Sequence, residues 1–83
     1  MTQRARIEAD FWRVFSGVMG RAFAPGYYLQ TDIAAWDSLR HVELVFELET
    51  TFGIEVPSEA IAGLFSDTDS VLSFLHDRLA ARP

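Results

Sequence analysis

The tripeptide Asp37-Ser38-Leu39 places a serine hydroxyl beside a carboxylate at a predicted helix start. A serine hydroxyl can act as a nucleophile when a base and an orienting group lie beside it, or another enzyme can attach a group to it. It can also be purely structural, because a short side-chain oxygen at a helix start accepts a hydrogen bond from a free backbone N–H. The neighbouring residues must distinguish catalysis, attachment and capping.

A hydrolase that used Ser38 as its own nucleophile would need a histidine base. His41 follows three residues later, and His76 could approach in the fold. However, the chain has no Gly-x-Ser-x-Gly turn, and 83 residues are too few to build a deep pocket. We therefore expect no catalytic residues, with His41 at the surface and His76 capping or decorating the last helix.

The sequence offers little to a metal ion. It has no cysteine, which excludes disulfides and thiolate ligands, and its two histidines form no site without carboxylates. The segment Asp67-Thr68-Asp69-Ser70 begins like a calcium loop, but it lacks the glycine at position six and the closing glutamate. We expect no metal and interpret the segment as helix capping.

Charge is divided unequally along the chain. The formal net charge is −5, with a net of +2 in residues 1–31 and −7 in residues 32–83. A helix-turn-helix protein would have a basic recognition helix, whereas the clearest helix here carries Glu43, Glu47 and Glu49. We expect no nucleic-acid partner. An acidic surface attracts proteins with basic patches, although it also simply keeps small proteins soluble.

Hydrophobic spacing predicts an all-α bundle of three main helices and one short helix, with a long packed loop after the first. The expected helices are 3–23, 37–52, 58–64 and 69–81, in one domain covering residues 1–83. Leu29, Ile33 and Trp36 of the loop are expected to pack into the core. No apolar run approaches the ~20 residues that cross a bilayer, and no signal-peptide core follows Met1, so we expect a cytoplasmic protein without membrane insertion.

The helix ends are predicted from local chemistry. Ala24-Pro25-Gly26 is expected to stop the first helix, and Asp37 or Ser38 to cap the second. Gly53 suits the position after the second helix, where positive φ is needed. Ser58 is expected to cap the short helix, and the segment that starts at Ser66 resembles a capping box for the last one.

A helical wheel of residues 37–52 separates a polar side from a buried side. The polar arc contains Arg40, Glu43, Glu47, Thr50 and Thr51, and the opposite side, expected to be buried, contains Val42, Val45, Leu48 and Phe52. Leu39 and Leu44 flank the polar arc, and Phe46 lies just beyond Leu39. Carboxylates flanked by apolar side chains suit transient docking of a partner protein, although an ordinary solvated helix face has a similar pattern.

Five short segments between residues 37 and 57 together resemble the acyl carrier protein family. They are Asp37-Ser38-Leu39, Val42-Glu43-Leu44-Val45, Leu48-Glu49, Phe52-Gly53 and Ile54-Glu55-Val56-Pro57. Thr31-Asp32-Ile33 and Ser70-Val71 agree with the same pattern. The tripeptide alone occurs often by chance, whereas the combined spacing is specific. The resemblance covers nearly the whole chain and is weakest in residues 1–28.

The resemblance implies a carrier that is not itself an enzyme. Ser38 would receive 4′-phosphopantetheine from coenzyme A through a phosphopantetheinyl transferase, and the arm's thiol would carry acyl groups as thioesters. Acyl-loading and acyl-processing enzymes with basic docking patches would be its partners. The residues that would contact them are Asp37, Leu39, Arg40, Glu43, Phe46 and Glu47. The alternative is a carrier-like interaction module that is never modified.

The residues on either side of the Asp37-Ser38-Leu39 motif depart from the family pattern. Arg40 stands where carriers of fatty acid synthesis usually have Asp, and His41 follows it. Ala35 replaces the usual glycine two residues before Asp37, and Trp36 directly precedes the motif. An acid-to-arginine change on a docking face alters which basic surfaces are accepted. The sequence therefore resembles carriers of specialised or secondary metabolism more than the housekeeping carrier.

Overall fold

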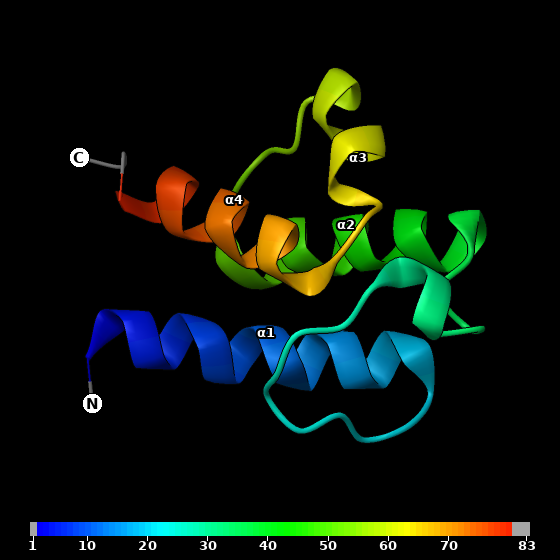
Figure 1. Cartoon of the computed structure of the whole chain (residues 1–83). Helices are drawn as coiled ribbons and strands as arrows, with labels where there is room; N and C mark the ends of the chain where they lie inside the picture. Colours follow the sequence, from blue (N-terminus) through cyan, green and yellow to red (C-terminus); the bar gives the residue numbers. More distant parts are fainter. Residues whose placement is uncertain (1, 81–83) are drawn as a thin grey trace.

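The computed structural model describes residues 2–80, which form helices and no named strand. The elements are α1 (Gln3–Met19), the 3₁₀ helix η1 (Gln30–Asp32), α2 (Ser38–Phe52), α3 (Ser58–Leu64) and α4 (Thr68–Ala80). Figure 1 shows α1 and α2 side by side in opposite directions, α4 along α1, and α3 crossing the bundle. The predicted all-α architecture with a long loop after α1 is confirmed. None of the helices in residues 2–80 has the length and apolarity to cross a membrane.

Helix α1 ends four residues earlier than the sequence predicts. Gly20 adopts a left-handed conformation with φ 87°, and its N–H donates to the Ser16 carbonyl. Only glycine adopts this conformation without strain, so it closes the helix before the predicted stop at residues 24–26 is reached. Phe23 is nevertheless buried, because the chain turns back and Ser16 Oγ accepts a hydrogen bond from the Phe23 N–H at 3.0 Å.

Both ends of α2 agree with prediction. Asp37 is the N-cap, and its Oδ1 accepts a hydrogen bond from the Arg40 N–H at 2.9 Å. Gly53 follows the last residue with φ 64°, and its N–H donates to the Glu49 carbonyl. These two local devices fix where α2 begins and ends, and they leave Ser38 as the first helical residue.

The starts of α3 and α4 differ from prediction. Ser58 is the first residue of α3 and not its cap, because Pro57 occupies the cap position and no side-chain hydrogen bond is made there. Before α4, the capping carboxylate is that of Asp67, whose Oδ1 accepts from the Ser70 N–H at 2.7 Å, and not the hydroxyl of Ser66. The predicted end of α4 at residue 81 lies outside the described residues.

The core combines aromatic side chains of α1 and of the loop with aliphatic side chains from all four α-helices. Phe15 is fully buried and packs edge-to-face on Trp36, which is also fully buried, and Ile33 is 4% exposed. Leu29 was predicted to join them but is 41% exposed. The backbone next to Leu29 pairs with the segment before α4, where the Gln30 N–H donates to the Ser66 carbonyl oxygen. The Leu29 side chain lies on the outside of this pairing.

Candidate functional site

Ser38 lies on the surface at the first position of α2. Among residues 2–80 its hydroxyl has no hydrogen-bond partner, because Asp37 performs the capping. In Figure 1 this start of α2 lies at the end of the bundle where α1 finishes. The Ser38 hydroxyl is therefore accessible and has no structural duty in the folded chain, which separates it from an ordinary capping serine.

His41 is buried, whereas the sequence predicts that it lies at the surface. Its side chain is 3% exposed. The Trp36 Nε1–H donates to His41 Nδ1 at 3.1 Å, and His41 Nε2 lies 2.8 Å from the Ile61 carbonyl oxygen. Both ring nitrogens are thus occupied by groups other than Ser38. Burial lowers the pKa of His41, and its bond to the Ile61 carbonyl offsets only part of that effect.

His76 has a partner on another helix, which the sequence did not predict. Its Nε2 lies 3.1 Å from Glu8 Oε2, so it connects α4 to α1 and does not cap or merely decorate its own helix. Arg4 shares the same carboxylate at 3.6 Å. Within the described residues, neither histidine contacts Ser38, and no nucleophile–base pair is formed there.

The outer side of α2 carries an apolar stripe at spacings of three and four residues. Leu39 is 67% exposed, Val42 42% and Phe46 62%. Val42 was predicted to be buried and Leu44 to flank the polar arc, yet Leu44 is fully buried. The inward stripe is formed by His41, Leu44, Val45 and Leu48. Relative to the predicted wheel, α2 is thus rotated so that Val42 joins Leu39 and Phe46 on the outside.

Two carboxylates border this apolar stripe. Glu43 and Glu47 are exposed, and within residues 2–80 neither forms an ion pair. With a rotation of about 100° per residue, Leu39, Val42 and Phe46 form one arc of the helix circumference. Glu43 lies next to this arc, and Glu47 lies one step further around the helix. Uncompensated charge beside exposed apolar groups is an arrangement suited to a protein partner that supplies basic residues.

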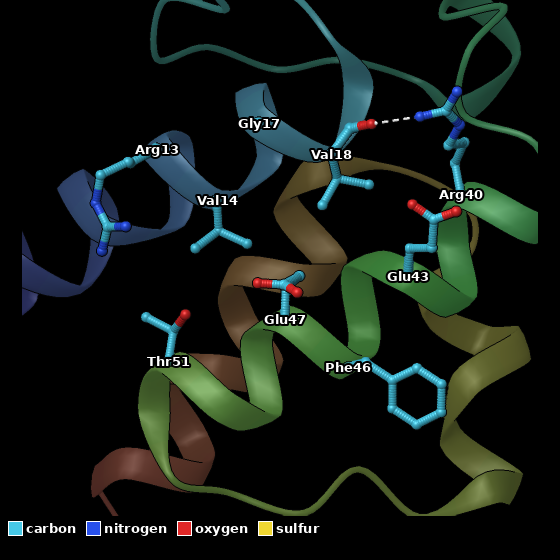
Figure 2. Close-up of a pocket in the computed structure, with 9 residues that line it drawn as sticks. All are labelled: Arg13, Val14, Gly17, Val18, Arg40, Glu43, Phe46, Glu47 and Thr51. Carbon is cyan, nitrogen blue, oxygen red and sulfur yellow. Dashed lines mark hydrogen bonds between the residues drawn. The ribbon is translucent and has the colours of Figure 1, made fainter.

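Glu43, Phe46 and Glu47 also border an open cleft of ≈ 490 Å³ between α1 and α2. Arg13, Val14, Gly17 and Val18 form its α1 wall (Figure 2). Arg40 closes one end, and its Nη1 donates to the Val18 carbonyl oxygen at 3.0 Å. This carbonyl belongs to the last turn of α1, where no helical N–H is available to it. Arg40 was predicted as a partner contact; in the folded chain it also caps α1.

Glu49 is a positioning residue that the sequence did not single out. It is half-buried, and its Oε2 accepts a hydrogen bond from the Val56 N–H at 2.8 Å. The bond ties the extended exit from α2 back onto the helix and so sets where α3 begins. The sequence of a helix containing Leu48-Glu49 does not reveal this role, because the Glu49 carboxylate accepts from a backbone N–H of a separate, non-helical segment.

A search of protein-family models and a search of solved structures each find no match to this chain. The functional interpretation therefore depends on what the residues themselves provide. These are an accessible hydroxyl on Ser38, an independent cap on Asp37, and an outer face of α2 that combines apolar side chains with unpaired carboxylates.

Proposed function

We propose that this protein is an acyl carrier that bears 4′-phosphopantetheine on Ser38 and presents acyl thioesters to partner enzymes. The observation that carries the proposal is the exposed Ser38 hydroxyl at the first position of α2, released from capping by Asp37. A capping serine would accept a hydrogen bond from a first-turn N–H, a role that Asp37 fills here. The family resemblance of residues 37–57 supplies the identity of the group attached.

The chemistry of attachment needs an accessible oxygen and nothing else from this chain. Ser38 Oγ would attack a phosphorus atom of coenzyme A, its proton passing to a base of the transferase while the nucleotide departs. The product is a phosphodiester with one negative charge at the start of a 15-residue helix. Free N–H groups and the helix dipole stabilise an anion at that end, typically by about 0.3–1 kcal/mol.

Partner recognition would use the outer face of α2. Leu39, Val42 and Phe46 offer apolar contact close to Ser38, and Glu43 and Glu47 attract a basic surface. Such interfaces associate and separate quickly, because charge speeds the encounter while the buried apolar area stays small. Arg40 places a positive charge inside this acidic strip, which favours partners that present an acid or a neutral group opposite it.

The proposed protein shuttles intermediates and performs no catalysis. Both nitrogens of His41 are occupied by Trp36 and Ile61, and His76 is bonded to Glu8, so neither imidazole is placed to activate Ser38. The thiol needed for thioester chemistry would come from the arm, since the chain has no cysteine. The rival is an interaction module that uses the same face of α2 and is never modified.

Intact-protein mass spectrometry after incubation with coenzyme A and a promiscuous phosphopantetheinyl transferase tests the proposal. We expect the wild-type chain to gain the mass of one arm and Ser38→Ala to gain none. Ser58→Ala is the matched control, because Ser58 is also an exposed first residue of a helix. Absence of any gain in folded wild-type protein would favour the unmodified interaction module.

A further inference from the structure

The hydrogen bonds around His41 fix the protonation state of its ring. An indole N–H can only donate, so His41 Nδ1 must accept from Trp36 Nε1, and the ring proton must be on Nε2. From there it is directed to the Ile61 carbonyl oxygen 2.8 Å away. The ring is therefore neutral and held as one tautomer, with each nitrogen matched to a partner of the opposite kind.

These two bonds join three separate elements. Trp36 belongs to the loop before α2, His41 to α2 and Ile61 to α3. The imidazole also stacks on Phe65, just after α3, with ring centroids 4.8 Å apart. Leu64 is the single buried residue of this seven-residue helix, and Ala60 and Ile61 pack partly buried against the core, so the bond to His41 is one of several contacts that hold α3 in place.

We propose that His41 is a pH-sensitive latch, which holds Trp36 of the loop on α2 while its ring is neutral and releases the Trp36 indole when the ring takes up a proton. Nε2 would keep its bond to the Ile61 carbonyl oxygen of α3, so the change falls on the loop side of the ring. A second ring proton would be added at Nδ1, the atom that accepts from Trp36. Two N–H donors would then face each other at a spacing of 3.1 Å, and that hydrogen bond would be lost. Protonation and the closed arrangement are therefore incompatible.

No carboxylate compensates a charge on this ring. The ionisable side chains of the loop before α2, of α2, of α3 and of the segment just after α3 are Arg21, Tyr27, Tyr28, Asp32, Asp37, Arg40, Glu43, Glu47, Glu49, Glu59 and Asp67. Within residues 2–80 none of them hydrogen-bonds or ion-pairs with the imidazole. A buried cation without a partner is strongly unfavourable, so the proton enters only when the site opens to water.

The direction of the pH effect follows from this difference. In the unfolded chain or with the site open to water, His41 has the ordinary pKa of about 6.5, whereas burial lowers it in the closed form. The open forms therefore bind the proton first as pH falls. The latch is fully effective above about pH 6.5, and below it the equilibrium moves toward opening by about tenfold per pH unit until the closed form also titrates.

Nuclear magnetic resonance between about pH 7.5 and 5.5 tests the latch, because imidazoles titrate in this range. We expect the Trp36 indole N–H signal and the backbone amide signals of loop residues 33–36 to shift together as pH falls, while amides in the last turn of α2 stay constant. In His41→Phe, which keeps a ring against Phe65, these shifts should disappear. His76→Gln removes the chain's other histidine and should retain them.

Two results would overturn the proposal. One is a titration of the Trp36 indole that persists in His41→Phe, or one that disappears in His76→Gln. The other is a His41 ring in the wild-type protein that titrates at or above its ordinary pKa while the Trp36 indole signal stays constant. This second measurement needs no variant, so it remains decisive if His41→Phe fails to fold, and neither result depends on whether Ser38 carries an arm.

Discussion

Helices α2 and α3 both begin with an exposed serine, but their starts are built differently. At α2 the Asp37 carboxylate caps the helix and leaves the Ser38 hydroxyl without a partner in the described chain. At α3 Pro57 occupies the cap position, where no side chain bonds to the backbone. A serine at a helix start is thus not a site by itself. What distinguishes Ser38 is a neighbour that does the capping and a long helix behind it.

The outward faces of the two helices differ as well. Helix α2 has 15 residues and exposes the large side chains of Leu39, Val42 and Phe46. Helix α3 has seven residues, and its exposed positions are occupied by Ser58, Glu59, Ala62 and Gly63, with no large apolar group among them. Of these two helices, α2 alone combines an exposed serine hydroxyl at its start with large exposed apolar side chains, and the following substitutions test this contrast.

The largest expected effect is on arm attachment. Ser38→Ala should abolish the mass gain completely, because no other oxygen replaces Oγ, whereas Ser58→Ala should leave it unchanged. Both proteins should give the same helical circular dichroism spectrum. Loss of the mass gain in Ser58→Ala, or its persistence in Ser38→Ala, would remove the distinction between the two helix starts.

The second largest effect concerns burial. Leu44→Ala in α2 removes a fully buried side chain from the centre of the bundle, and we expect a loss of about 3–4 kcal/mol in the free energy of unfolding. Leu64→Ala in α3 should cost less, about 2 kcal/mol, since a short peripheral helix can collapse around the gap. Urea unfolding at neutral pH measures both. Equal losses would mean that α3 is integrated into the core as firmly as α2.

A smaller effect is expected from capping. Asp37→Ala should lower the free energy of unfolding by about 1 kcal/mol, because the Arg40 N–H loses its acceptor. Ser58→Ala should change it by no more than about 0.5 kcal/mol, as expected for a surface site without such a bond. Thermal unfolding of the two variants side by side is sufficient, and a larger loss for Ser58→Ala would contradict the assignment of the caps.

The smallest effect is expected from docking charge. Glu43→Gln should lower kcat/KM for arm transfer by less than about fivefold, as is usual for one exposed charge, and the difference should shrink at high salt. Glu59→Gln changes the same charge on α3 and should have no effect. Equal losses for both variants would show that the net charge of the protein matters and the position of Glu43 does not.

The boundaries of α2 could be predicted because they depend on neighbours in sequence. A carboxylate before the first turn and a glycine after the last are sufficient signals. The end of α1 could not be predicted in the same way. Helical spacing of apolar residues continues to Phe23, yet Phe23 reaches the core through a reversal of the chain after Gly20. Spacing alone does not distinguish a helix from a loop that folds back onto it.

The candidate site was predictable only in part for a similar reason. Ser38, Leu39 and Phe46 are exposed as expected, but apolar residues cover so much of α2 that its pattern does not fix which side faces inward. Val42 was therefore assigned to the wrong side. His41 was assigned to the surface because its burial depends on Trp36 and Ile61, and nothing in the sequence shows that these residues of other elements meet its ring.

The hydrogen bond from Arg40 to the Val18 carbonyl sets a condition for anyone who redesigns the docking surface. Replacing Arg40 by Asp would make the face of α2 uniformly acidic, but it would also remove the donor at the end of α1. A graft of α2 onto another helical scaffold would lose that contact too, unless the new scaffold offers a carbonyl at the same place. The transplantable unit of this protein is therefore the pair α1 and α2, not the single helix that carries Ser38.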